Sequence, residues 1–208
     1  MDIGAEARSA WVAGAILIAA TTCGHAAQPA AAPPCEACHG GYGEGMQAAG
    51  VPRIAGQSAE YLQKQLDDYA RGTRDNPIMR NFAILLSEAQ RAKFAQHFAS
   101  QSAPFAPSAP LDPQQAARGH QLAFQGDESR RVQACNNCHG PDGIGVLHSA
   151  PYLAGQSAPY LSAALKAWQQ GSRRNDGGES MQSVAARLDD ADIAAVAGYY
   201  ASLSFSTP

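Results

Sequence analysis

Two five-residue stretches of one pattern carry the residues best suited to chemistry. Each reads Cys-x-x-Cys-His, and together they hold Cys35, Cys38, His39, Cys135, Cys138 and His139. Two thiols three positions apart lie on one side of a helical turn, so both can form thioether bonds to one porphyrin. The histidine that follows supplies an axial nitrogen to the iron. Each stretch therefore predicts one covalently attached haem c, which makes two in all.

Paired cysteines also have other uses. A lone Cys-x-x-Cys serves as half of a zinc site or as a redox dithiol, and two pairs can form one four-thiolate zinc site. Such a site would leave the histidine after each pair unexplained. Both copies also continue with glycine, Gly40 and Gly140, which favours two equivalent haem sites. Zinc or disulfide chemistry stays the alternative.

A methionine stands in a matching place after each copy. Met79 lies 40 residues after His39, and Met181 lies 42 residues after His139. Each follows a helix by a short polar loop, so each is predicted to reach the haem face opposite its histidine. A thioether ligand favours ferrous iron and raises the reduction potential. With both axial positions filled, substrate cannot reach the iron, and the protein passes electrons without acting as an enzyme.

Four other side chains are candidates for the sixth position. Met46 is only seven residues after His39, so it is expected to pack or to lie at the surface. His97 and His120 fall on predicted helices, and His148 is close to the second motif. One methionine per repeat is the more economical assignment.

The elements that must position these residues also repeat. Ala-Gly-Gln-Ser at 55–58 recurs 99 positions later at 154–157, and a predicted helix follows each copy. Ser58 and Ser157 are the expected N-caps, and both helices should end near glycine. The apolar residues of the two helices fall at helical spacing, and they are Tyr61, Leu62, Leu66 and Tyr69 in one and Tyr160, Leu161, Leu165 and Trp168 in the other.

A closing helix is predicted in each repeat. Ser87 and Gln90 form a capping box for the first, and Asp189 caps the second. The positions expected to be buried are led by Phe94 and Phe98 in the first, and by Ile193, Val196 and Tyr200 in the second.

The repeats predict two domains of unequal make-up. The expected organisation is a signal peptide over 1–27, a first domain over 28–103, a Pro-rich linker over 104–111 and a second domain over 112–208. A helix capped by Asp112 and Pro113 precedes the second haem motif, whereas the first domain has no such helix. The face of Phe94 and Phe98 is therefore expected to be exposed, or to be covered by the linker, the other domain or another protein.

Composition and the N-terminal sequence bear on the binding partners and the cellular location of the protein. Formal net charge is −3, which leaves no basic footprint for nucleic acid. Arg8 precedes an apolar run over 11–20 that is too short to span a bilayer, which predicts a secretory signal and a periplasmic location. Membrane association through partners or an uncleaved leader is an alternative, as is lipidation of Cys23.

These residues resemble the cytochrome c4 family, tandem dihaem class I cytochromes c, over most of 35–203. The resemblance rests on the two Cys-x-x-Cys-His-Gly stretches, the paired Ala-Gly-Gln-Ser segments and the Asn-Pro-Ile-Met loop that ends at Met79. It implies an all-α fold of two domains, each wrapping one haem. It also implies that the carbonyl oxygens of Pro52 and Pro151 accept hydrogen bonds from the haem-binding histidines, and that Gly119 and Tyr200 mark a close helix crossing.

Of three candidate functions, the resemblance and the closed irons favour the first two. The first is a periplasmic carrier of single electrons between respiratory partners such as an oxidase or a reductase. The second is a dihaem electron-transfer subunit of a dehydrogenase, similar to that of flavocytochrome c sulfide dehydrogenases. The third is a haem enzyme, such as a peroxidase or a thiosulfate-oxidising cytochrome, which requires an open sixth position.

Overall fold

The computed structural model describes residues 35–105, 110–146 and 150–204, all within one compact unit, Ala32–Pro208. The described residues form helices, turns and isolated bridges, which confirms the all-α prediction. The predicted signal peptide, Cys23 and His148 lie outside the described residues. None of the described helices is both long and apolar enough to cross a membrane.

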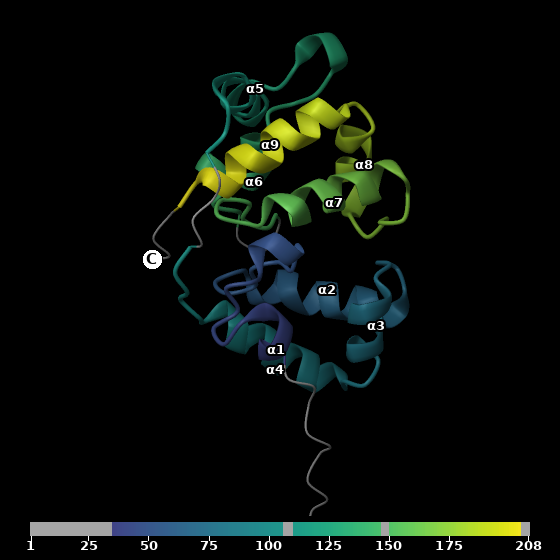
Figure 1. Cartoon of the computed structure of the whole chain (residues 1–208). Helices are drawn as coiled ribbons and strands as arrows, with labels where there is room; N and C mark the ends of the chain where they lie inside the picture. The colour runs from purple at the N-terminus through teal and green to yellow at the C-terminus, as the bar shows by residue number, and fades with distance from the viewer. Residues whose placement is uncertain (1–34, 106–109, 147–149, 205–208) are drawn as a thin grey trace, which may run out of the picture. The chain divides into compact units, whose positions relative to one another are not determined.

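The first repeat supplies the helices in the lower part of Figure 1. They are α1 (Glu36–His39), the 3-10 helix η1 (Gln47–Ala49), α2 (Ala59–Arg71), α3 (Pro77–Ala83) and α4 (Glu88–Ala99). The side chain of Ser58 caps α2 by accepting from the Tyr61 amide, and α2 ends at Gly72 in a left-handed conformation. Ser87 and Gln90 form the predicted capping box of α4. The helix α2 packs against both α3 and α4.

The second repeat supplies the helices in the upper part of Figure 1. They are α5 (Pro113–Phe124), η2 (Glu128–Arg130), α6 (Asn136–His139), η3 (Pro141–Gly143), α7 (Ala158–Gln169), η4 (Gly177–Glu179), α8 (Ser180–Ala185) and α9 (Asp190–Ser202). Asp112 caps α5 with Pro113 at its first position, and Ser157 caps α7. The helix α9 packs against α5 and α7.

The two repeats differ in the size of their apolar cores. The second core draws on α5, α7 and α9, and its buried residues are Leu122, Ala123, Val132, Leu161, Leu188, Ile193, Val196, Ala197 and Tyr200. The first contains the buried residues Leu62, Ala95 and Phe98. A small protein-only core fits a domain in which a large flat cofactor supplies much of the apolar contact.

Phe98 is buried, as predicted for the closing helix, with only 3% of its surface exposed, so it does not contribute to the exposed face that the missing first helix had suggested. The loop after the first haem motif covers Phe98. A Cβ on Gly43 would lie 2.8 Å from the Phe98 ring, and one on Gly143 would lie 2.4 Å from the Tyr200 ring. The absence of a side chain at Gly43 lets the backbone approach the aromatic ring directly. Phe94, one turn earlier, is half-buried.

Close approach also joins α5 to α9 in the second repeat. A Cβ on Gly119 would lie 2.4 Å from the Ala195 carbonyl oxygen and 2.6 Å from the Tyr199 Cβ. Gly119 therefore marks the predicted crossing, with Ala195 and Tyr199 as its contacts. The adjacent Tyr200 instead packs on the loop at Gly143 and donates a hydrogen bond to Asn136.

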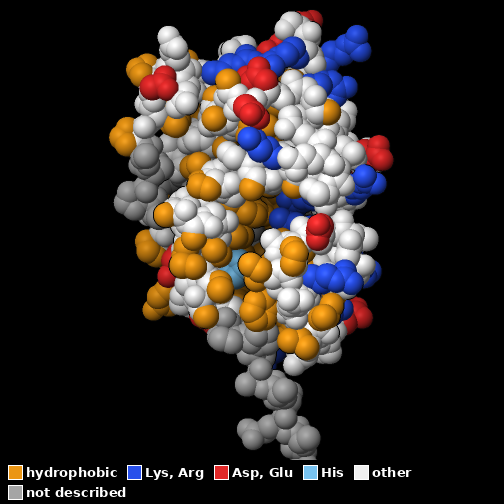
Figure 2. Space-filling model, turned by 45° about the vertical axis from the view of Figure 1, so that its right-hand side comes forward, with side chains coloured by type: hydrophobic (Ala, Val, Ile, Leu, Met, Phe, Trp, Pro, Cys, Tyr) orange, Lys and Arg blue, Asp and Glu red, His pale blue; other side chains and the backbone are white. Residues whose placement is uncertain are grey.

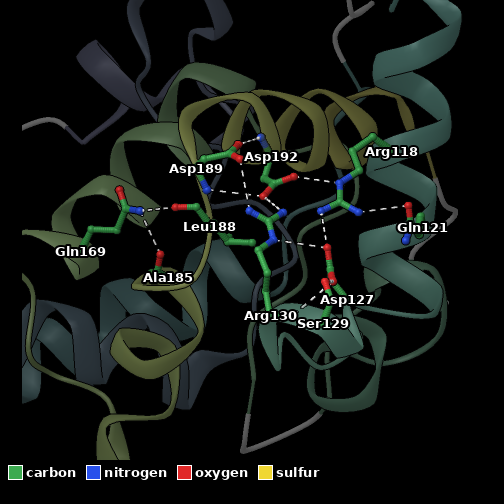
Figure 3. Close-up of polar contacts among 10 residues, drawn as sticks. All are labelled: Arg118, Gln121, Asp127, Ser129, Arg130, Gln169, Ala185, Leu188, Asp189 and Asp192. Atoms are coloured by element: carbon green, nitrogen blue, oxygen red, sulfur yellow. Dashed lines mark hydrogen bonds and ion pairs between the residues drawn. The ribbon is translucent and has the colours of Figure 1, made fainter.

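A network of five charged side chains reinforces this crossing (Figure 3). Arg118 of α5 donates to Asp127 and to Asp192 of α9, at 2.7 and 2.8 Å. Arg130 pairs with Asp127, Asp189 and Asp192. Asp189 and Asp192 also form the capping box of α9, so the network fixes the start of that helix against α5.

Candidate functional site: two haem-attachment motifs and the contact between them

Each Cys-x-x-Cys-His stretch forms one short helix that places all three functional groups together. Cys35 caps α1, which ends at His39, and Cys135 caps α6 in the same way. The second cysteine of each stretch, Cys38 or Cys138, is exposed, the first is half-buried and the histidine is buried. None of the four described cysteines is in a disulfide, so each pair is available for two thioether bonds.

A backbone carbonyl orients each histidine. His39 Nδ1 lies 2.9 Å from the Pro52 carbonyl oxygen, and His139 Nδ1 lies 2.8 Å from that of Pro151. This contact commits Nδ1 as the donor and leaves Nε2 for a metal. Burial lowers the pKa of both histidines, against the opposing effect of the carbonyl contact. The neutral imidazole that iron requires is therefore favoured, and these residues fit a haem.

The two methionines begin short helices that follow the repeated α2 and α7. Met79 lies in α3 and Met181 in α8, and both are half-buried. The amide of each donates to a side-chain oxygen, that of Met79 to the N-cap Asn76 at 2.9 Å and that of Met181 to Asp176 at 2.6 Å. Figure 2 shows apolar side chains around a recessed histidine over the part of the surface that carries α1 to α4. Such an apolar surround suits a porphyrin.

The competing ligand candidates lie elsewhere. Met46 is 42% exposed and pairs through its backbone with Val51. His97 and His120 are exposed on α4 and α5, and the ring of His120 stacks on Phe124. Within the described residues, no group of three or more His, Cys, Asp and Glu side chains could hold a metal ion, which weighs against a four-thiolate zinc site.

The Ala-Gly-Gln-Ser segments form the contact between the repeats, a role that sequence reasoning missed. The Gln57 amide donates to the Tyr152 carbonyl oxygen and accepts from the Tyr152 amide, at 3.0 and 3.3 Å. Gln156 makes the same pair of bonds with the backbone of Arg53, both at 2.8 Å. The recurrence of Gln57 and Gln156 at one place in the repeat was the available signal. Because the two glutamines occupy equivalent positions, each binds the backbone of the opposite repeat in the same way.

A buried arginine pair is a second feature that sequence reasoning missed. Arg74 and Arg173, 99 positions apart, form an antiparallel bridge between the repeats. Arg74 donates to Gln65 Oε1 and to the Tyr160 hydroxyl, and Arg173 donates to Gln65 Oε1 and to the Tyr61 hydroxyl. These acceptors are neutral, so two positive charges are buried here on uncharged partners. The carboxylates of a haem would complement such charges.

The tyrosines of this contact respond differently to their surroundings. Burial raises the pKa of Tyr61. At Tyr160 the effect of burial is outweighed by the charges of Arg74 and Arg173, which lower its pKa to about 8. The contact between the repeats is therefore electrostatically positive at its centre.

Proteins similar to this chain include cytochromes c, in agreement with the two haem-attachment motifs. The family described as Cytochrome c matches residues 116–204. The thiosulfate dehydrogenase electron acceptor of Stutzerimonas stutzeri is 44% identical over 175 residues, which cover 83% of this chain and 80% of that protein. Cytochrome c4 of Pseudomonas aeruginosa is 38% identical over 176 residues, which cover 84% of this chain and 86% of that protein.

Two solved structures share the fold. Cytochrome c4 from Pseudomonas stutzeri superposes with a TM-score of 0.75 at 34% identity, covering 82% of this chain and 93% of that one. A thiosulfate dehydrogenase from Marichromatium purpuratum gives a TM-score of 0.77 at 36% identity, covering 82% of this chain but only 36% of that one. This chain belongs to the cytochrome c4 family, and it is an electron-transfer protein with two covalently attached haems c.

Proposed function

We propose that this protein is a periplasmic electron acceptor for a thiosulfate-oxidising dehydrogenase, and that both of its irons are closed to substrate. One observation carries the choice of donor. The thiosulfate dehydrogenase electron acceptors of Stutzerimonas stutzeri and Thiomonas intermedia are 44% and 43% identical to this chain, against 38% for cytochrome c4 of Pseudomonas aeruginosa. A general carrier between other respiratory partners is the second candidate, supported by the cytochrome c4 relatives.

The proposed site assigns a role to each residue of the motifs. Cys35 and Cys38 attach one haem and Cys135 and Cys138 the other, with His39 and His139 as the proximal ligands. Pro52 and Pro151 hold the histidine rings, and Met79 and Met181 occupy the sixth positions. A bound haem c takes up and releases one electron at its iron. The chain's own part is to hold both axial ligands so that water and substrate stay off the iron.

The domain organisation proposed for this function follows the repeats. Residues 28–103 and 112–208 form the two haem domains, joined by a linker over 104–111, behind a signal peptide over 1–27. The contacts of Gln57 and Gln156 support this organisation, because each glutamine side chain binds the backbone of the other domain. Arg53 adds to this, because its guanidinium donates to the carbonyl oxygens of Ala103 and Pro104 where the linker begins.

Electron delivery tests the donor. The oxidised holoprotein is mixed with a purified thiosulfate dehydrogenase and thiosulfate, and haem reduction is followed by absorption. We expect both haems to be reduced on the timescale of turnover by the dehydrogenase. No reduction should occur when either the enzyme or thiosulfate is omitted. A holoprotein that dithionite reduces but the enzyme does not would contradict the proposed donor and leave the general carrier.

Carbon monoxide tests the closed irons. The reduced wild-type protein should show no change of its haem spectrum under carbon monoxide, because Met79 and Met181 fill the sixth positions. Rapid binding of one equivalent would instead show an open iron and favour a haem enzyme.

A further inference from the structure

The segment that carries Met181 is held by the other repeat. Asn175 lies between Arg173 and Met181, and its side-chain amide donates to Asp68 Oδ2 at 2.7 Å and to Gln65 Oε1 at 2.9 Å, both on α2. Lys64 of α2 donates to the Asn175 carbonyl oxygen at 2.5 Å. Three hydrogen bonds therefore tie one residue of this loop to a helix of the first repeat.

The receiving carboxylate is itself rigidly held. Asp68 is buried, and it also accepts from Lys64, Arg71 and Thr73. Burial alone would raise the pKa of Asp68, but the hydrogen bonds from Lys64, Asn175 and Arg71 outweigh it and hold the pKa below its usual value. A charged, immobile acceptor gives a stronger hydrogen bond than a neutral, mobile one.

A short path leads from this contact to the methionine. Asp176, next to Asn175, accepts from the Met181 amide through Oδ2. Fixing Asn175 therefore fixes the neighbouring residue whose carboxylate binds the Met181 amide near the start of α8. The chain between them needs such support, because it includes Gly177, Gly178 and a left-handed Glu179.

The first repeat has no matching arrangement. The positions of Lys64, Gln65 and Asp68 recur 99 residues later as alanines, Ala163, Ala164 and Ala167, which carry no polar side-chain atom. Asn76, the residue 99 positions before Asn175, is exposed.

The methionine of the first repeat is held locally instead. Met79 follows Arg74 by five residues, whereas Met181 follows Arg173 by eight. Asn76 and Pro77 start α3 directly, and Asn76 caps it at the Met79 amide. A shorter loop with its own cap loses less conformational entropy when it is ordered.

We propose that Lys64, Asp68 and Asn175 form a brace between the repeats that positions Met181, so that the sixth ligand of the second haem depends on the first repeat. This inference rests on the proposed assignment of Met181 as that ligand. The brace residues are positioning residues, and they act on the iron through the loop. The ligand of the first haem, Met79, does not depend on the brace.

The test compares Asn175→Ala with Asp75→Ala, the exposed residue that follows Arg74 in the first repeat. Carbon monoxide binding to the reduced holoproteins is measured, together with the thioether-to-iron absorption band of the oxidised proteins. Asn175→Ala should bind carbon monoxide at one haem, with an open fraction raised about tenfold or more for the loss of both side-chain hydrogen bonds to α2, one of them to a carboxylate. Asp75→Ala should behave as the wild type does.

A paired rescue separates positioning from general damage. Asn175→Asp places a carboxylate against Asp68 and should open the second haem further. When Asn175→Asp is combined with Asp68→Asn, the amide donor lies at position 68 and the carboxylate acceptor at position 175. This exchange should restore the thioether band toward its wild-type intensity. Circular dichroism confirms that each variant is folded.

Comparison with Met181→Ala distinguishes failure of the brace from failure of the ligand assignment. Met181→Ala should open one haem fully, and adding Asn175→Ala to it should change nothing more. If Met181→Ala opens a haem while Asn175→Ala and Asn175→Asp both behave like Asp75→Ala, the brace is wrong. If Met181→Ala leaves both haems closed, the assignment beneath it is wrong.

Discussion

At each haem motif, the imidazole is oriented by contacts that the protein makes on its own. The carbonyl oxygens of Pro52 and Pro151 engage Nδ1, and burial keeps the rings neutral. The orientation of Nε2 in each ring is therefore set by the protein fold, before any metal binds. The methionines are held less directly, through backbone amides that donate to the side chains of Asn76 and Asp176.

Removal of each methionine in turn should open one iron. We expect Met79→Ala and Met181→Ala each to bind one equivalent of carbon monoxide when reduced. Each should also lower the potential of one haem, because loss of a thioether removes a ligand that favours ferrous iron. Met46→Ala is the matched control and should leave both properties unchanged. Spectroelectrochemical titration measures the potentials, and an effect of Met46→Ala equal to that of Met79→Ala would contradict the assignment.

At the scale of elements, the second repeat depends on a close crossing of α5 and α9. Gly119 lets the backbones touch, and the network of Arg118, Asp127, Arg130, Asp189 and Asp192 locks the start of α9. In the first repeat, the loop at Gly43 packs directly on Phe98 of α4. The loop at Gly143 packs on Tyr200 of α9 in the same way, so the crossing with α5 is an additional support of the second closing helix.

Gly119→Ala should destabilise the second repeat, because the new Cβ meets the Ala195 carbonyl oxygen and the helices must separate. Overpacking of this kind costs about 1–3 kcal/mol. Gly198→Ala on α9 is the control: its Cβ would meet the end of the flexible Leu111 side chain, and alanine favours a helix. Denaturant unfolding of the two holoproteins should rank Gly119→Ala as clearly the less stable. Equal stabilities would show that the crossing can relax.

The charged network should make stability depend on pH. The hydrogen bonds of Asp127 with Ser129 and Arg118 hold its pKa well below its ordinary value. At pH values between the folded and unfolded pKa of Asp127, the unfolded chain binds more protons than the folded chain does. The stabilisation is therefore complete above about pH 4 and is lost as the pH falls through the folded pKa.

Asp127→Asn tests this dependence. The variant should be less stable than the wild type at pH 7, and the difference should shrink steadily as the pH falls below about 4. Thermal unfolding at a series of pH values measures the difference in stability between the variant and the wild type. Asp112→Asn is the comparison, because Asp112 caps α5 outside the network. A difference that stays constant across the acid range would mean that charge is not the cause.

At the scale of the whole molecule, local symmetry joins the repeats. Gln57 and Gln156 each bind the backbone of the opposite repeat, and Arg74 and Arg173 meet between them. The symmetry is broken at Asn175, which is bound by Lys64, Gln65 and Asp68.

Gln57→Ala should loosen this contact. It removes the two hydrogen bonds that Gln57 makes with the buried backbone of Tyr152, at about 1 kcal/mol for each bond. We expect unfolding to separate into two transitions when followed by haem absorption, since the repeats then unfold independently. Gln114→Ala, at the exposed start of α5, should keep the wild-type profile. A single unshifted transition for Gln57→Ala would show that the glutamine contributes little.

Local features of this protein were readable from its sequence. The haem motifs rest on covalent spacing within one helical turn, and the caps at Ser58, Ser87, Asp112 and Asp189 rest on hydrogen bonds that span two or three residues. The repeat itself predicted two similar all-α units. Interactions confined to a few neighbouring residues are present in any fold that forms those helices.

Only the tertiary structure decided how segments about 100 residues apart meet. It showed Phe98 covered by the Gly43 loop, where the lack of a preceding helix had suggested an exposed face. It also paired Gln57 with Tyr152, and Asn175 with Asp68. The physical reason is that such contacts depend on which backbones can approach closely and which buried polar groups then need partners. The spacing of Gln57 and Gln156 marks equivalent positions in the repeats, but it does not specify either condition.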